Sequence, residues 1–324
     1  MRYVIIGAGA VGQALAAEYE LAGIDYVLIG RGAQLDHLQA HGLTYVRPSG
    51  TQRVPLKVAA DTALAPDDVL ILTVKTQDVE VTTAHWADLP VAGGGVAADL
   101  PIVTLQNGLD AERIASRRFT RVYAASILVP AVFVDTGKVT VLSGPQLASV
   151  VLGRFPEGTD TTSARIVADL TTANSLAEER ADITRWKAAK LLHNVKNVLE
   201  LFSGDPTTAA RNITQEAQAA LMAAGYDPAA RSERQVDISG WEVLRDSSSE
   251  PTGQSTWQSF TRGARSEVDY LNGEIARLGV LHGVPTPWNR AAQRLAAQLA
   301  TTGGAPGSMD VARLHDMTAA EGGA

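Results

Sequence analysis

The sequence of 324 residues contains no cysteine. This absence excludes disulfide bonds, metal sites with thiolate ligands and a thiol nucleophile. Lysine and arginine form no run and the net charge is −7, so the composition gives no sign of a nucleic-acid or anionic-membrane surface. The sequence also lacks an apolar run that could cross a bilayer and the charged and apolar regions of a secretion signal. We therefore expect a cytoplasmic protein that binds a small molecule.

A glycine-rich motif stands near the N-terminus in a strand–loop–helix setting. Tyr3 to Ile6 is apolar like a buried parallel strand, and GAGAVG follows at Gly7, before an alanine-rich helical pattern that ends near Ala22. In such a motif Gly7 allows the tight turn, Gly9 lets the backbone approach a pyrophosphate, and Gly12 lets helix and strand pack closely. The alternative is a glycine-rich turn without a ligand, but the setting favours a dinucleotide site. Its expected contacts are Gly7, Gly9, Ala10, Val11 and Gly12.

The end of the second strand indicates which dinucleotide is bound. An NAD-binding protein usually has Asp or Glu there for the ribose 2′-hydroxyl, whereas this chain has Gly30-Arg31-Gly32 after the strand Tyr26 to Ile29. The planar guanidinium of Arg31 suits a 2′-phosphate, and no carboxylate stands at that position to repel one. Unless Arg31 is an ordinary exposed arginine, the expected cofactor is NADP, used as NADPH.

Polar side chains follow two further buried strands. Residues 68–74 run into Lys75-Thr76-Gln77, and residues 102–105 run into Gln106-Asn107-Gly108. In a doubly wound sheet, ligands bind outside the carboxyl ends of the strands, so Lys75, Gln77 and Asn107 are expected near the nicotinamide half of the cofactor or a substrate. Any one of them could be an ordinary loop residue, but their shared position at successive strand ends favours a site.

Two domains follow from these patterns. The length and a hydrophobic content of 45% allow two sizeable cores. We predict an α/β fold, with an N-terminal doubly wound sheet of the Rossmann type over 1–175 and a smaller all-α domain over 182–301. The first domain should include an antiparallel hairpin at 43–47 and 53–59 and end with a helix at 161–172. Later helices are expected near 206–224, 232–244, 257–279 and 287–299, before a flexible tail at 302–324.

The stretch from Ile183 to Phe202 predicts one long helix with two different faces. Apolar residues at helical spacing form one face, which should pack into a core. The other face is either a solvated surface or a cleft for a polar substrate, and the large apolar groups beside its lysine favour the cleft. Its members are Trp186, Lys190, His193, Asn194 and Asn197.

Several motifs together resemble those of the ketopantoate reductases (2-dehydropantoate 2-reductases). The resemblance extends from Met1 to about Asn289. Besides GAGAVG, it rests on VKTQD, LQNG and KLLHN and on a later block with family-like order and spacing. That block, the most specific part, comprises STWQ from Ser255, RSEVDYLNG from Arg265 and GVPTPWN from Gly283.

The resemblance implies NADPH-dependent reduction of a 2-oxo acid to a 2-hydroxy acid. The leading reaction is 2-dehydropantoate to pantoate, in pantothenate and coenzyme A biosynthesis. Lys190 matches the catalytic lysine of the family, whose ammonium can stabilise charge on the carbonyl oxygen and then deliver a proton. Asn107, Asn194 and Ser255 match its substrate-binding residues. Glu267 matches a glutamate that binds substrate and tunes the lysine, and we expect Glu267 and Asn107 to contact the cofactor too; otherwise Glu267 is half of a surface ion pair.

Three positions depart from the family pattern. Val198 stands where a second asparagine is usual, eight residues after Lys190, and we expect the neighbouring Asn197 to bind substrate in its place. Thr256 and Ser259 replace a methionine and an aspartate. These departures leave open another branched 2-oxo acid or ketone as substrate, and also a non-catalytic protein that binds or senses NADP(H).

Other partners and enzyme classes are less favoured by the sequence. A 3-hydroxyacid dehydrogenase or imine reductase would share both domain types, but would not combine the lysine helix with the later EVDYLNG and GVPTP motifs. No metal site, nucleic-acid partner or membrane partner is predicted. The helical faces of the second domain are compatible with a homodimer.

Overall fold

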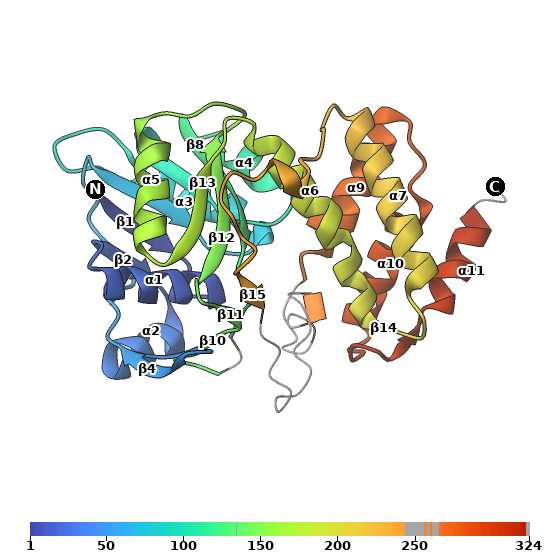
Figure 1. Cartoon of the computed structure of the whole chain (residues 1–324), viewed down its shortest axis with the longest axis horizontal. Helices are drawn as coiled ribbons and strands as arrows, with labels where there is room; N and C mark the ends of the chain where they lie inside the picture. The colour runs from blue at the N-terminus through green and yellow to red at the C-terminus, as the bar shows by residue number, and fades with distance from the viewer. Residues whose placement is uncertain (134, 244–255, 258–259, 261–265, 322–324) are drawn as a thin grey trace. The chain divides into compact units, whose positions relative to one another are not determined.

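The computed structural model describes residues 1–133, 135–243, 256–257, 260 and 266–321 (Figure 1). The chain divides into two compact units. Unit 1 contains Met1–Gln106, Asp110–Thr184 and the segment that begins at Arg231. Unit 2 contains Asn107–Leu109, Arg185–Ala230 and the described residues from Thr256 onward. The short loop Asn107–Leu109 thus belongs to unit 2, although the chain on both sides of it belongs to unit 1.

One large sheet forms the centre of unit 1, and its described strands run in the order β13-β12-β8-β7-β6-β1-β2-β5. All neighbours pair in parallel except β12 and β8, which are antiparallel. The prediction of a doubly wound, mainly parallel sheet is confirmed. The strands are β1 (Arg2–Ile6), β2 (Tyr26–Ile29), β5 (Val58–Ala59), β6 (Asp68–Leu72), β7 (Pro101–Thr104), β8 (Arg121–Leu128), β12 (Ala148–Arg154) and β13 (Ser175–Glu179).

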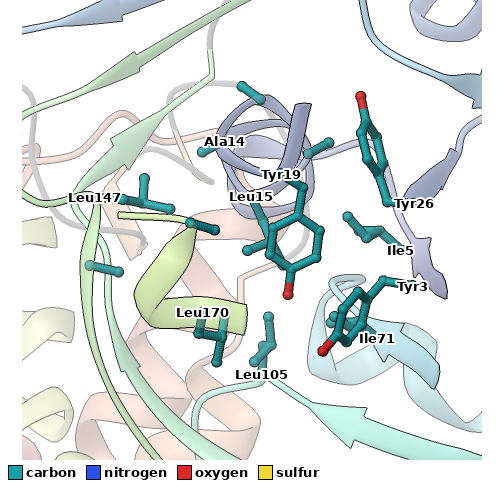
Figure 2. Close-up of a cluster of buried hydrophobic side chains, with 14 of the residues drawn as sticks. Tyr3, Ile5, Ala14, Leu15, Tyr19, Tyr26, Ile71, Leu105, Leu147 and Leu170 are labelled. Atoms are coloured by element: carbon teal, nitrogen blue, oxygen red, sulfur yellow. The ribbon is translucent and has the colours of Figure 1, made fainter. Parts of the chain in front are cut away.

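Helices cover both faces of this sheet. Side chains of β1 alternate between the faces, so Tyr3 and Ile5 pack into a core with α1 and α5, whereas Val4 and Ile6 pack into one with α3 and α4. Figure 2 shows the first core, where the ring of Tyr19 from α1 lies 5.0 Å from that of Tyr3. The helices are α1 (Ala10–Ala22), α2 (Gly32–His41), α3 (Val79–Ala87), α4 (Asp110–Ala115) and α5 (Thr161–Thr172), with 3₁₀ turns η1 (Thr76–Asp78) and η2 (Ala97–Asp99).

The predicted hairpin forms a second, smaller sheet in unit 1. β3 (Leu43–Arg47) and β4 (Gly50–Val54) pair antiparallel, and β10 (Lys138–Val141) and β9 (Ala131–Val132) extend the sheet beyond β3. The buried carboxylate of Glu18 on α1 binds this sheet, because it accepts hydrogen bonds from Arg47 and, at 2.7 Å, from the hydroxyl of Tyr45. The end of the predicted second strand differs, since β5 joins the large sheet instead.

The segment from Arg231 is part of unit 1 and bonds to β13 of the large sheet. Oε2 of Glu178 on β13 accepts hydrogen bonds from the backbone amides of Gln235 at 2.7 Å and Val236 at 3.1 Å. The prediction of a helix at 232–244 is therefore wrong for the described residues, because these backbone amides bond to a distant carboxylate. Within the described residues 231–243, helical structure is limited to η4 (Arg231–Glu233), and β15 (Glu242–Val243) pairs with β11 (Ser143–Gly144).

Unit 2 is helical, as predicted, and Figure 1 shows α7, α9 and α10 side by side. The expected flexible tail differs from the structure, in which α11 follows α10 and buries Leu314 in the core of unit 2. No helix in the described ranges has the length and apolar character needed to cross a bilayer. The elements are α6 (Ile183–Asn194), η3 (Val195–Leu201), α7 (Thr207–Ala223), α9 (Val268–His282), α10 (Pro287–Thr301) and α11 (Ala312–Glu321), with paired β14 (Phe202–Ser203) and β16 (Met309–Asp310).

A carboxylate of α7 caps α10. The residue before α10, Thr286, makes no side-chain capping bond. Instead Glu216 accepts hydrogen bonds of 2.9 Å from the backbone amides of Trp288 and Asn289. These amides belong to the first turn of the helix, where no carbonyl is available within the helix and a negative charge is favourable. Glu216 therefore fixes α10 against α7.

Glu216→Ala should lower the free energy of unfolding by about 1.5–3 kcal/mol, because it removes charge-assisted bonds to two helix amides. Urea denaturation of this variant beside Gln218→Ala, an exposed residue on the same helix, measures the effect. Equal stabilities of the two variants would contradict the capping role.

Candidate active site

The glycine loop between β1 and α1 is held by close backbone packing. Gly7 has φ +123°, a conformation that side chains disfavour. A Cβ on Gly12 would lie 2.0 Å from the carbonyl oxygen of Gly7 and 2.7 Å from Oγ1 of Thr73. The Thr73 hydroxyl donates to the carbonyl of Gly7 at 2.7 Å. The geometry thus shows Gly7 in a tight turn and Gly12 in close packing. The Thr73 hydroxyl bonds to the first and lies against the second.

The middle glycine of the loop faces open space. A Cβ on Gly9 would meet no atom within 4 Å. Gly9 is the residue before α1, so the first amides of that helix, from Ala10, Val11 and Gly12, have no carbonyl partner within the helix. Open space beside helix amides fits the pyrophosphate of a dinucleotide.

Polar residues follow the aligned strand ends at this edge of the sheet. Ile6 of β1 pairs with Ile29 of β2 and with Leu72 of β6, so the segments after these strands lie next to one another. Arg31 is exposed and extended, with φ −148°, directly before α2, and its side chain makes no capping bond. Lys75 directly precedes η1, which contains Gln77, and both are partly buried.

Gln106, which follows β7, binds the backbone at the end of the neighbouring strand β6. Its Nε2 donates to the carbonyls of Leu72 at 2.9 Å and Val74 at 2.8 Å. Our sequence reasoning assigned no role to Gln106 or Thr73, although a polar residue directly after a fully apolar strand is a signal for such bonds.

Asn107 belongs to unit 2 because the residues after it pack there. Gly108 has φ +81°, and a Cβ on it would lie 2.6 Å from the carbonyl oxygen of Tyr270 on α9. Leu109 is buried in the apolar core of unit 2. Asn107 therefore shares a compact unit with Lys190, Asn194, Asn197 and Glu267.

Unit 2 carries the predicted polar row of Lys190, Asn194 and Asn197. Lys190 and Asn194 lie on α6, four residues apart, and so on the same side of that helix. After Asn194 the backbone changes to η3, a 3₁₀-helix in which residues three apart lie in line. Asn197 therefore continues the row, and Asn194 and Asn197 are largely buried, with 6% and 4% of their surface exposed.

The change to a 3₁₀-helix matches a spacing of three in the sequence. Val195, Val198 and Leu201 recur every three residues and are at most 1% exposed. A helix with about three residues per turn places them in one buried stripe. The prediction of a single α-helix to Phe202 is therefore wrong beyond Asn194, although Val198 lies on the apolar side as expected.

Positive charge dominates this part of α6 and η3. The pKa of His193 is lowered, first because its ring is partly desolvated and then because Lys196 and Lys190 are nearby. His193 is therefore mainly neutral at pH 7, and the lysines supply the charge.

Glu267 lies within the described residues, whereas Ser255 does not. Glu267 directly precedes α9, and its carbonyl accepts a hydrogen bond of 2.9 Å from the amide of Tyr270. Ser255 and Ser259 lie outside the described residues, while Thr256 is buried. Within the described ranges, no group of three or more His, Cys, Asp or Glu side chains could hold a metal ion.

Two family models match the chain. The one described as Ketopantoate reductase PanE/ApbA matches residues 3–157, and the one described as Ketopantoate reductase PanE/ApbA C terminal matches residues 184–300. The chain belongs to the ketopantoate reductase family. The resemblance inferred from the motifs is confirmed. As a member of this family, the protein is an oxidoreductase that acts on CH–OH groups of a small molecule with a nicotinamide cofactor.

Relatives and solved structures match along most of the chain. A 2-dehydropantoate 2-reductase of Archaeoglobus fulgidus is 30% identical over an alignment of 302 positions that covers 89% of this chain and 94% of the relative. The crystal structure of a PanE/ApbA family ketopantoate reductase from Ralstonia eutropha JMP134 has a TM-score of 0.76 at 24% identity, covering 94% of this chain and 99% of that one. A ternary structure of D-mandelate dehydrogenase with NADH and anilino(oxo)acetate has the same TM-score and coverage at 19% identity. The two structures share the fold of this chain.

Gly12→Ala should destabilise the protein without cofactor by about 1–3 kcal/mol, because its methyl group would collide with the Gly7 carbonyl. Gly9→Ala should stay within about 0.5 kcal/mol of the unchanged protein, since Gly9 has an ordinary φ of −83° and open space around it. Urea denaturation of both variants compares them, and equal losses would contradict this account of the loop.

Proposed function

We propose that the protein reduces a 2-oxo acid with NADPH, and that its substrate is 2-dehydropantoate, which becomes pantoate for pantothenate and coenzyme A biosynthesis. The observation that carries the proposal is the row of Lys190, Asn194 and Asn197, held in one compact unit with Asn107 and Glu267. Relatives that match most of the chain and are named 2-dehydropantoate 2-reductase support the choice of substrate.

Arg31 supports NADPH as the cofactor. It is exposed and directly follows Gly30, the residue after β2, which lies beside the glycine loop, since a Cβ on Gly30 would be 3.0 Å from the Ala8 side chain. The guanidinium can bind the 2′-phosphate with two parallel hydrogen bonds. Gly7, Gly9, Ala10, Val11 and Gly12 would hold the pyrophosphate, and Lys75, Gln77, Asn107 and Glu267 complete the proposed cofactor contacts.

The proposed chemistry depends on Lys190. The chemistry that NADPH would supply when bound is a hydride for the carbonyl carbon of the substrate. The ammonium of Lys190 stabilises the negative charge that forms on the carbonyl oxygen and then gives that oxygen a proton. Amides of Asn107, Asn194 and Asn197 can donate hydrogen bonds to the carboxylate of the substrate, and the Ser255 hydroxyl adds another donor. Glu267 would hold the ammonium in place.

Another 2-oxo acid is the second candidate substrate. Val198 stands where the family pattern has an asparagine and is buried in the apolar core of unit 2, so the set of substrate-binding amides differs from the family pattern. The D-mandelate dehydrogenase with the same fold was solved with anilino(oxo)acetate, a 2-oxo acid with an aromatic group. This combination favours a bulkier branched or aromatic 2-oxo acid over a ketone without a carboxylate.

Lys190→Ala should reduce kcat with 2-dehydropantoate by about 10²- to 10⁴-fold, because both charge stabilisation and the proton donor are lost. Binding of NADPH, followed by its fluorescence, should stay within about twofold because the side chain acts on the carbonyl. Lys196→Ala, in the adjoining 3₁₀-helix, is the control and should retain turnover. Full activity of Lys190→Ala would refute the assigned mechanism.

Arg31→Ala should raise KM for NADPH by about 10- to 100-fold and leave KM for NADH nearly unchanged, because only NADPH has the 2′-phosphate. Steady-state kinetics with each cofactor make the comparison. An equal rise for both cofactors, or no rise, would show that Arg31 does not read the phosphate.

A further inference from the structure

A buried asparagine of α9 reaches the point at which α6 becomes η3. Asn272 is fully buried, and its Nδ2 donates a hydrogen bond of 2.9 Å to the carbonyl oxygen of Val195. Val195 is the first residue of η3 and directly follows Asn194. The bond therefore ties α9 to the backbone between Asn194 and Asn197, the two asparagines of the polar row.

A network of buried groups sets the orientation of this amide. Nδ2 of Asn272 also donates to Oδ1 of Asn289 at 3.1 Å. Nδ2 of Asn289 in turn donates to the carbonyl of Ile213 at 3.0 Å and to Glu216 at 2.9 Å. Carbonyl and carboxylate oxygens only accept hydrogen bonds, so the amide nitrogens must face them. The network thus links η3 to α7, α9 and α10.

Asn272 is an unfavourable residue if it only fills space. Its Oδ1 is buried and has no hydrogen-bond partner in the described part of the chain. Such an oxygen lowers stability, and an apolar residue would avoid the loss. The surrounding cluster consists of apolar residues such as Leu271 and Ile275. What Asn272 contributes in this setting is its bond to the Val195 carbonyl.

The bond to Val195 lies where the helix type changes, and the helix type sets the rotation about the helix axis between Asn194 and Asn197. Each residue turns the chain by about 100° in an α-helix and about 120° in a 3₁₀-helix. An α-helix would therefore leave Asn197 about 60° out of line with Asn194, whereas the 3₁₀-helix aligns the two. Runs beyond about three or four residues of 3₁₀-helix are uncommon, so the 7 residues of η3 need outside support. A side chain that enters the bonding pattern of an α-helix is a recognised cause of a local departure from regular α-helix.

We propose that Asn272 is a positioning residue for substrate binding. Through Val195 it holds the start of η3 in the 3₁₀ form and so aligns Asn197 with Asn194. This inference rests on the proposed function and deepens it. It explains why Asn194 and Asn197 lie in line, next to the Val198 that stands where the family pattern has an asparagine.

Kinetics of Asn272→Ala, Asn197→Ala and the double variant test the proposal. Asn197→Ala should lower kcat/KM for 2-dehydropantoate by about 10- to 100-fold, the loss expected for a hydrogen bond to a charged substrate. Asn272→Ala should lower it by a similar factor, through KM for the oxo acid and not for NADPH. In the Asn197→Ala background, Asn272→Ala should add less than about a threefold loss, because both changes remove one function.

Leu314→Ala is the matched control. Leu314 is fully buried in α11, which packs mainly on α10, so its loss opens a cavity in the same unit. Thermal unfolding compares the stability of Leu314→Ala with that of Asn272→Ala. Leu314→Ala should keep KM for the oxo acid within about twofold of the unchanged protein. If Asn272→Ala does not fold, Asn272→Ser provides a smaller change at the same site. The proposal would be overturned if the Asn272 variants left kcat/KM unchanged. It would also be overturned if the loss in the double variant equalled the product of the two single losses.

Hydrogen exchange separates this inference from the proposed function. Amides of residues 196–201 should exchange about tenfold faster in Asn272→Ala than in Leu314→Ala, because the support of η3 is lost. Equal exchange would overturn the role of Asn272 even in an active enzyme. An unchanged protein that reduces no 2-oxo acid would instead refute the proposed function, and the exchange comparison would still decide whether Asn272 holds η3.

Discussion

The carbonyl of Val195 lies where an α-helix turns into a 3₁₀-helix, and the candidate substrate residues depend on that change. Up to Asn194 the row follows the four-residue spacing of an α-helix, and after it the row follows a spacing of three. The buried side of the segment obeys the same rule, since Val195 and Val198 are three residues apart. One change in helix type therefore serves both the apolar core and the polar face.

Both units hold short backbone segments by bonds from residues that lie elsewhere in the sequence. In unit 1, Thr73 binds the glycine loop and Gln106 binds the end of β6. In unit 2, Asn272 binds the start of η3, while Glu216 caps α10. Each bond reaches a backbone group at or near the end of a strand or helix. Pre-organised backbone of this kind keeps binding groups in place before a ligand arrives.

Elements with local, periodic patterns could be predicted from the sequence, and those set by distant partners could not. The strand, glycine loop and helix at the N-terminus, and the helix after Pro206, are local patterns that the structure confirms. The 7 residues of η3 directly continue the apolar pattern of α6, so the sequence predicts one α-helix there. The course of the chain after Arg231 depends on Glu178, and α11 depends on burial of Leu314. The roles of the individual site residues remain predictions.

The central claim is that this family member is an NADPH-dependent reductase of 2-dehydropantoate. The most direct test measures kcat/KM of the unchanged protein for 2-dehydropantoate and for a branched and an aromatic 2-oxo acid, each with NADPH and with NADH. The account predicts the highest value for 2-dehydropantoate with NADPH, at least about tenfold above NADH, as expected for a cofactor read through its 2′-phosphate. A clear preference for another oxo acid, or for NADH, would contradict it.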